Sequence, residues 1–192
     1  MVRVQGVGAI RRSRQPGSSA SVHLAPMRRR HLRQVLRIEA RVYPRPWSLA
    51  LFMSELSLRS TRAYHVARVG GSTVGYCGLM LTGEEAHVTT IAVAPEWQRA
   101  KVGTRLMLHM AKVARERGAH QLSLEVRVGN TGAQALYHRF GFQPAGIRKN
   151  YYTETNEDAL VMWAPDIDGP DYERRLLSIE AELDGPTVVD DH

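Results

Sequence analysis

The fold is decided by residues 91–104, which read Ile91-Ala92-Val93-Ala94-Pro95-Glu96-Trp97-Gln98-Arg99-Ala100-Lys101-Val102-Gly103-Thr104. An apolar strand over 86–93 stops at the proline, a basic loop follows, and the spacing predicts a helix over 103–117. The first turn of a helix leaves N–H groups unpaired and carries partial positive charge, so such a loop suits a pyrophosphate. Many strand-to-helix joins carry Arg and Gly for turn geometry alone, so the loop by itself leaves both interpretations open.

The elements on either side of this stretch alternate in a way that defines a fold class. Three consecutive strands come first and form a meander, and strand–helix alternation follows. This order indicates an α/β or α+β domain with one mixed sheet flanked by helices. The other predicted helices cover 27–42, 48–58, 131–140 and 171–183, and the other predicted strands cover 22–24, 63–69, 73–81, 121–126, 142–152 and 159–163.

The composition fits an ordinary globular chain with one domain. The 192 residues are 43% apolar and 23% charged, which is enough to bury a core. Cys77 is the single cysteine, so no intrachain disulfide can form, and a reducing cytoplasm is the expected location. No apolar run is long enough for a transmembrane helix, so no membrane partner is expected. The N-terminus lacks the apolar core of a signal peptide, although its Arg and Ser without acids leave a transit-like interpretation open.

The net charge of +7 is spread unevenly along the chain. Residues 1–38 hold nine Arg and no acid, whereas residues 164–192 hold nine acids against two Arg. Polyanion binding is one interpretation, and solvated tails around a mildly basic domain are the favoured one. The organisation expected is a disordered basic arm over 1–21, a folded domain over 22–164, and an acidic C-terminal tail with a possible short helix over 165–192.

A second stretch carries the chemistry further. Residues 124–137 read Leu124-Glu125-Val126-Arg127-Val128-Gly129-Asn130-Thr131-Gly132-Ala133-Gln134-Ala135-Leu136-Tyr137, and Phe140-Gly141-Phe142 follows. Later come Arg148-Lys149-Asn150-Tyr151-Tyr152, and Pro46-Trp47-Ser48 stands near the front. Together with the loop at 98–103, these motifs resemble the GNAT superfamily of N-acetyltransferases, and in particular its RimI-type branch of ribosomal-protein alanine N-acetyltransferases. The resemblance covers about residues 24–163.

The resemblance implies the GNAT fold, with a mixed, mostly antiparallel sheet of about six to seven strands, and acetyl-CoA as co-substrate. The residues that it assigns to the coenzyme are Ile91, Ala92, Val93, Arg99, Ala100, Lys101, Val102, Gly103, Thr104 and Asn130. Lys101 departs from the family pattern, which has glycine there. A lysine can still donate its backbone N–H if its φ is negative, and its ammonium could contact a phosphate. Asn130 could equally stabilise a turn.

Two residues are the candidates for acid–base chemistry. Glu125 points away from the apolar side of its strand, as an exposed strand carboxylate would. The resemblance makes it the general base for an N-terminal amine, whose pKa of about 7.7–8.0 needs only a modest pull. Tyr137 could be a half-buried packing residue. The resemblance makes it the acid that protonates the departing thiolate.

The acceptor side is the part that would separate substrates within the superfamily. Trp47, Tyr151 and Tyr152 are candidate walls for the acceptor peptide, although clustered aromatics are often core or rim packing. By resemblance the expected substrate is the N-terminal alanine of a small-subunit ribosomal protein. Two rivals stay open: an acetyltransferase for lysine side chains or small amines, and a non-enzymatic ribosome- or nucleic-acid-binding module that uses the Arg-rich arm.

Other reactive residues indicate no further chemistry. Cys77 lies among apolar neighbours in a predicted strand, where cysteine usually behaves as an inert small side chain. The eight histidines show no metal-ligand spacing, so no metal is expected. Direct nucleic-acid binding is not expected, because the arm does not account for the ordered motifs at 91–104 and 124–142.

Overall fold

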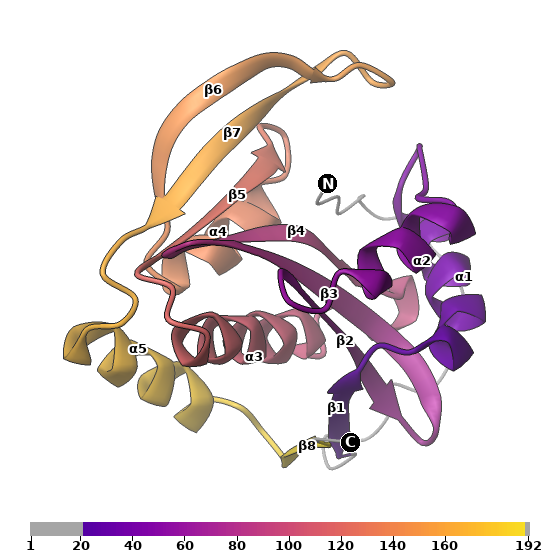
Figure 1. The fold of residues 1–192 in the computed structure, drawn as a ribbon, viewed down its shortest axis with the longest axis horizontal. Coiled ribbons are helices and arrows are strands. Elements are labelled where there is room, and N and C mark those ends of the chain that lie inside the picture. Colours follow the sequence, from indigo (N-terminus) through magenta and orange to yellow (C-terminus); the bar gives the residue numbers. More distant parts are fainter. Residues whose placement is uncertain (1–20, 191–192) are drawn as a thin grey trace.

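The computed structural model describes residues 21–190, whose strands form one mixed sheet (Figure 1). Within that range the sheet has eight strands in the order β6-β7-β5-β4-β3-β2-β1-β8. β4 runs parallel to β5 and β1 runs parallel to β8, and the other neighbours are antiparallel. The strands are β1 (Val22–Pro26), β2 (Arg62–Val69), β3 (Ser72–Thr82), β4 (Glu85–Val93), β5 (Gln121–Arg127), β6 (Gln143–Tyr152), β7 (Glu157–Ala164) and β8 (Thr187–Val189).

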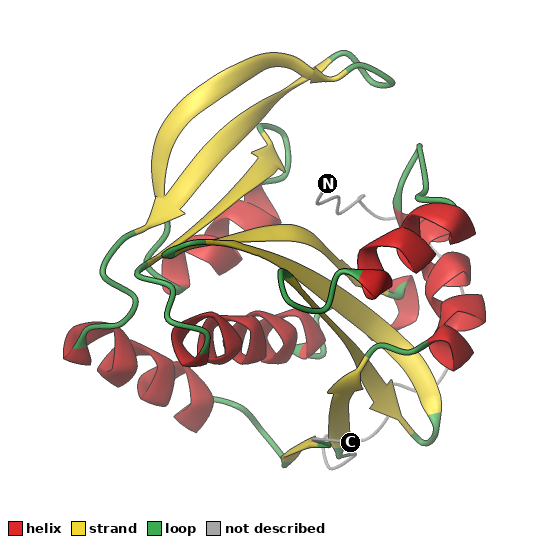
Figure 2. Cartoon of the chain, viewed as in Figure 1, coloured by secondary structure: helices red, strands yellow, loops and turns green. Residues whose placement is uncertain are grey.

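Helices cover both faces of this sheet (Figure 2). α1 (Leu32–Val42) and α2 (Leu49–Ser57) pack on one face around Phe52 and Tyr76. α3 (Val102–Glu116), α4 (Thr131–Arg139) and α5 (Pro170–Ala181) pack on the other face, in a larger core cluster that includes Leu106 and Met110. The two clusters place apolar layers on both sides of the central strands, which explains why β3 is buried along most of its length.

β5 shows how the alternation of the sequence sets the faces. Leu122, Leu124 and Val126 join the core cluster beneath α3, so the intervening Ser123 and Glu125 point to the face that carries α1 and α2. The expectation that Glu125 points away from the apolar side of its strand is confirmed.

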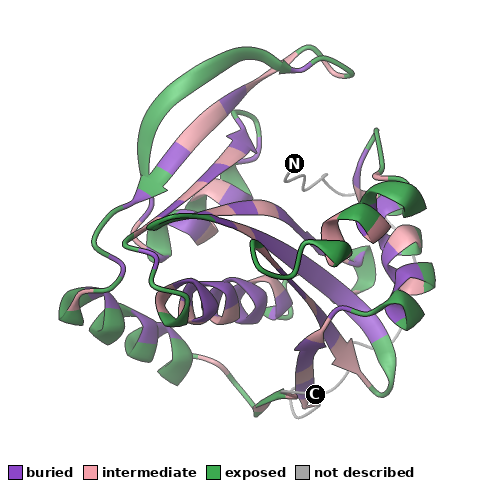
Figure 3. Ribbon diagram, viewed as in Figure 1, coloured by how far each residue is buried: buried purple, intermediate pink, exposed green. Residues whose placement is uncertain are grey.

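The β6–β7 hairpin stands apart from the packed layers. Every residue of β6 from Gln143 to Tyr151 is exposed, and Figure 3 shows this strand as the exposed upper edge of the sheet. A buried arginine holds the hairpin in place: Arg127 ion-pairs with Glu154 and Glu157 from the turn, and its guanidinium lies 3.9 Å from the ring centre of Tyr152. The hairpin is therefore anchored to the end of β5.

The fold class is as predicted, with one strand more than the six to seven expected. The additional strand is β8, which pairs with β1 and lies in the segment interpreted as an acidic tail. That segment also contains α5, at the position of the expected helix over 171–183. β8 has only three residues, too few to show an alternation in the sequence. Apart from Ser21, the expected basic arm over 1–21 lies outside the described residues.

Candidate active site

The centre of the site is a gap between two parallel strands. In the described chain, β4 and β5 pair at Glu85–Gln121, Ala86–Leu122 and His87–Ser123, and beyond these positions the two strands diverge. A register shift between β3 and β4 at Gly78/Leu79 marks a bulge at the same level. Bulges increase local twist and bend a strand away from its neighbour. The outer halves of β4 and β5 therefore leave a slot that opens to both faces of the sheet.

Ile91 and Val93 of β4 turn their backbone N–H and C=O groups toward this gap. The Ala94 N–H donates to the Val74 carbonyl of β3. In an antiparallel ladder alternate residues bond to the same neighbour, so Ile91 and Val93 face the other way. Their carbonyls accept side-chain hydrogen bonds instead, from the Tyr43 hydroxyl at 2.8 Å and from Gln98 Nε2 at 3.4 Å. The amides of Ile91 and Val93 are placed to pair with an extended ligand in the slot, as an added strand would.

The loop between β4 and α3 ends in left-handed backbone. A short 3-10 turn over Pro95–Trp97 leads into it, and both Arg99 (φ 66°) and Lys101 (φ 57°) have positive φ. Lys101 is the N-cap of α3 and, within the described residues, no side chain caps that end. The first amide of the helix with an intrachain backbone acceptor is that of Arg105, which donates to Lys101. The amides before it converge on the helix start, which is the arrangement that binds phosphate.

The backbone of Lys101 does not meet the condition that the sequence analysis stated for it. A lysine here could donate its N–H if its φ were negative, whereas Lys101 adopts the left-handed φ for which glycine is ordinarily used. Its ammonium is turned to the C-terminal segment, donating to the Glu182 carbonyl at 2.5 Å and lying 3.3 Å from Asp184. Arg105 is buried and bonds to the same segment, at Asp184, Gly185 and Thr187. The loop therefore presents backbone groups, while these two side chains hold the C-terminal segment.

Tyr137 brings a phenol to the gap from the α4 side. The residue is fully buried, and no hydrogen-bond partner for its hydroxyl exists among the described residues. Burial raises the pKa of Tyr137 well above its usual range, and the phenols of Tyr43 and Tyr152 raise it further. Those two phenols bond to Ile91 of β4 and Glu125 of β5, so the three hydroxyls gather where the strands part. An unpartnered buried donor is a costly feature that a bound acceptor atom would satisfy.

Asn130 acts on the start of α4. Its side chain is buried and accepts from the Ala133 N–H at 3.2 Å, which makes it the N-cap of the helix that carries Tyr137. This is the turn-stabilising role that the sequence left open beside a role in coenzyme binding.

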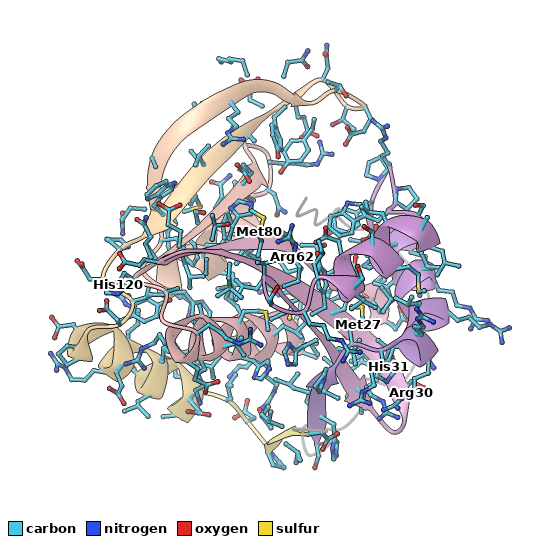
Figure 4. The ribbon with its side chains drawn as sticks, viewed as in Figure 1. Met27, Arg30, His31, Arg62, Met80 and His120 are labelled. Atoms are coloured by element: carbon cyan, nitrogen blue, oxygen red, sulfur yellow. The ribbon has the colours of Figure 1, made fainter. Side chains whose placement is uncertain are left out.

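The opposite mouth of the gap is a pocket of about 300 Å³ on the α1–α2 face. Trp47 and Tyr151, both expected as acceptor walls, line it from opposite sides. Tyr152 lies behind the wall, buried against Arg127 with its hydroxyl 3.4 Å from the Glu125 carbonyl. Met80 and Arg62, a cross-strand pair, also line the pocket, and Figure 4 labels them next to each other. The remaining lining residues are Leu51, Glu55, His87, Val88, Thr89 and Glu125.

Glu125 lies in this pocket with both carboxylate oxygens engaged. Its side chain is 10% exposed; Oε2 lies 3.1 Å from His87 Nε2 and Oε1 lies 3.2 Å from an Arg148 nitrogen. The hydrogen bond from His87 lowers the pKa of Glu125 below its usual range, and Arg148 adds to that effect against the opposing effect of burial. Glu125 is therefore a carboxylate at neutral pH, and its base strength depends on its two partners.

Sequence reasoning missed His87, Glu55, Arg62 and Met80. His87 faces Glu125 only because β4 and β5 are parallel neighbours, a pairing that no short motif reveals. Glu39 was also missed: it is buried on α1, its pKa is raised by burial, and it accepts the Trp47 N–H at 3.1 Å. The apolar spacing of α1 could have suggested it, because Glu39 stands four residues after the buried Val35 and so lies on the same face of the helix.

Neither a metal site nor a membrane helix is found in the described part of the chain. Among residues 21–190, no group of three His, Cys, Asp or Glu side chains could hold a metal ion. No helix in that range is both long enough and apolar enough to cross a bilayer. Cys77 is buried as expected, and burial raises the pKa of its thiol.

Comparisons with known proteins agree with this geometry. The sequence profile of the Acetyltransferase (GNAT) family matches residues 32–142. A Bacillus subtilis (strain 168) protein, named provisionally as a ribosomal protein bS18-alanine N-acetyltransferase, is 42% identical over 137 residues, covering 71% of this chain and 91% of the relative. The ribosomal protein bS18-alanine N-acetyltransferase of Escherichia coli (strain K12) is 36% identical over 130 residues, covering 67% and 86%.

A solved structure shows the same architecture. The crystal structure of the ribosomal-protein-S18-alanine N-acetyltransferase from Escherichia coli superimposes with a TM-score of 0.70 at 33% identity, covering 76% of this chain and 94% of that one. With the parted parallel strands, the amides at the start of α3 and the buried phenol, the assignment is complete: the chain belongs to the GNAT family and is an acetyl-CoA-dependent N-acetyltransferase.

Proposed function

We propose that this enzyme transfers acetyl from acetyl-CoA to the N-terminal α-amine of alanine in a ribosomal protein of the bS18 type. One observation carries the proposal: Glu125 lies in a pocket at one mouth of the gap, while Tyr137 reaches the gap from the other face. The two relatives whose names give this acceptor align with this chain over 91% and 86% of their own lengths. Ribosomal proteins are made in the cytoplasm, so the proposal places the enzyme there.

The residues present fit acetyl-CoA. The amides of residues 101–104 would face a phosphate at the start of α3, where no side chain of the described residues caps the helix. The amides of Ile91 and Val93 would hold the pantetheine arm, and the Val93 amide would also serve the thioester oxygen as negative charge develops there. The unpartnered Tyr137 hydroxyl lies in the same slot. Acetyl-CoA supplies the activated acyl group.

Glu125 would handle the proton of the amine. An α-ammonium has a pKa of about 7.7–8.0, so a substantial fraction is deprotonated near neutral pH. The amine nitrogen attacks the thioester carbon, a C–N bond forms, and the nitrogen becomes acidic. Its proton passes to the Glu125 carboxylate, directly or through one water. Because Glu125 is only 10% exposed, its charge also attracts the ammonium more strongly than an exposed carboxylate would.

Tyr137 would protonate the leaving group. When the C–S bond breaks, the sulfur carries negative charge, and a free thiol has a pKa of about 8.5. The raised pKa of Tyr137 means that the phenol keeps its proton until such an acceptor is in place. The phenol therefore donates a hydrogen bond to the departing sulfur and then its proton, which solvent replaces.

The size of the pocket supports a small first residue. About 300 Å³ is shared by the amine, its side chain and the start of the second residue. The Trp47 ring packs on Phe52 at 5.3 Å between centroids, and its backbone N–H is held by Glu39. The Trp47 ring is therefore fixed on two sides. An alanine methyl group fits against it, whereas a larger side chain would have to displace the ring.

A peptide panel tests the proposal. Peptides that begin with Ala, Ser, Leu or Glu, and an N-terminally blocked peptide with an internal lysine, are offered with acetyl-CoA, and acetylation is located by mass spectrometry. The proposal predicts acetyl on the α-amine, with the highest kcat/KM for Ala. Equal reaction of the blocked lysine peptide would show a lysine acetyltransferase instead.

A further inference from the structure

His87 has a place in the pocket that no motif accounts for. It occupies the last position at which β4 still pairs with β5, opposite Ser123. Its Nδ1 lies 2.9 Å from Ser123 Oγ and its Nε2 lies 3.1 Å from Glu125 Oε2. The three side chains follow one another on the face of the sheet away from α3, and His87 and Glu125 line the pocket.

The two oxygens of Glu125 have different neighbours. Oε2 faces His87, whose side chain is 26% exposed and fixed by the sheet. Oε1 faces Arg148, whose side chain is 56% exposed and comes from the solvated strand β6. Because the Arg148 side chain lies mostly in solvent, its guanidinium can leave Oε1 and be hydrated at little cost. An approaching ammonium can therefore replace Arg148 at Oε1, whereas His87 stays at Oε2.

We propose that His87 is a positioning residue for Glu125: Ser123 orients the imidazole so that Nε2 donates to Oε2, which directs Oε1 at the acceptor amine. The proposal deepens the function proposed above and rests on it. The amine proton ends on Oε1, and His87 neither gains nor loses a proton in the step. The Ser123 hydroxyl donates to Nδ1, which leaves the proton of the neutral ring on Nε2.

Glu125 is not the only charged group of the pocket. The other titratable or charged groups around the pocket are Glu55 of α2 and Arg62 of β2, which pair with each other at 2.7 Å, and Arg148 and Tyr151 of β6. The arginines stay charged, and burial raises the pKa of Tyr151.

Two substitutions separate the roles. His87→Gln keeps an amide donor of similar reach but cannot become a cation, and His87→Leu removes the donor. We expect His87→Leu to lower kcat about tenfold with the KM for acetyl-CoA unchanged, and His87→Gln to restore kcat to within about threefold at pH 8. His120→Gln, at an exposed histidine paired with Asp168, is the matched control and should behave as wild type.

A second readout does not depend on the acceptor. In the free protein, carboxyl-detected NMR follows the titration of Glu125, and its midpoint should rise in His87→Leu because that variant lacks the hydrogen bond of His87 that lowers the pKa of Glu125. A midpoint that does not move in His87→Leu, or a wild-type kcat in that variant, would each overturn the proposal. Failure of the wild type to acetylate any α-amine, with the midpoint shift present, would count against the proposed function alone.

Discussion

The two mouths of the gap between β4 and β5 are built in different ways. On the α3 side, one contiguous stretch from Ile91 to Thr104 supplies backbone amides, and Tyr137 of the next helix is the side chain that we propose to act there. On the α1–α2 side, the pocket is assembled from the side chains of Trp47, Arg62, His87, Glu125 and Tyr151, which come from separate parts of the chain. A site made of backbone amides tolerates changes in sequence. A site made of side chains depends on which residues are present, and these residues determine which substrate it accepts.

Lys101 illustrates the first half of that comparison. The family pattern has glycine at this position, yet the lysine holds the same left-handed backbone, at a cost of about 1–2 kcal/mol for a residue with a Cβ. Its ammonium contacts to Glu182 and Asp184 offset part of that cost. The amides of the loop keep their directions although the side chain differs.

The largest expected effect tests whether the two mouths cooperate in one reaction. Glu125→Gln should lower kcat by about 10²- to 10⁴-fold, and Tyr137→Phe by less, about 10- to 100-fold, because a thiolate is a tolerable leaving group. Acetyl-CoA affinity, measured by calorimetry, should be nearly unchanged in Glu125→Gln. A variant that keeps wild-type kcat would remove its residue from the chemistry.

The next effect tests whether the pocket alone reads the acceptor. Trp47→Ala should raise the KM for an Ala-initiated peptide about tenfold, since loss of one packed aromatic wall is worth about 1.4 kcal/mol. The KM for acetyl-CoA should not change. Trp163→Ala, on β7 and outside the pocket, is the control. A rise in both KM values for Trp47→Ala would mean that the two mouths are not separate.

The substitution with the smallest expected effect on catalysis lies on the face of the sheet that α3 covers. His65 of β2 contacts His109 of α3 edge to face, with 4.3 Å between ring centroids, and burial lowers the pKa of His65 from 6.5 to about 3. At pH values between these two pKa values the unfolded chain binds the proton and the folded chain does not. The free energy of unfolding therefore falls as the pH drops. The slope is about 1.4 kcal/mol per pH unit.

His65→Leu should remove that slope from denaturant unfolding curves recorded between pH 6.5 and pH 5, and leave kcat at pH 8 within about twofold. His120→Leu, at a histidine whose side chain is 56% exposed, provides the comparison. An unchanged slope in His65→Leu would show that the imidazole is already protonated in the folded state.

The same contrast explains what the sequence could predict. The strand, loop and helix around Lys101 are neighbours in the chain, so their geometry follows from local rules, and the alternation around Glu125 gave its face correctly. The contact between His87 and Glu125 depends on pairing between β4 and β5. The position of Trp47 depends on the hydrogen bond from its backbone N–H to Glu39 of α1. The three-residue strand β8 is too short for a pattern and is set by its pairing with β1.

The most direct test of the account compares two substitutions at one position by titration calorimetry with acetyl-CoA. Lys101→Gly keeps the left-handed backbone, and Lys101→Pro forbids it and removes one N–H. With both variants folded by circular dichroism, the account predicts an affinity within about threefold of wild type for Lys101→Gly and a loss of about 100-fold for Lys101→Pro. Equal affinity in all three proteins would show that the amides at the start of α3 do not hold the coenzyme.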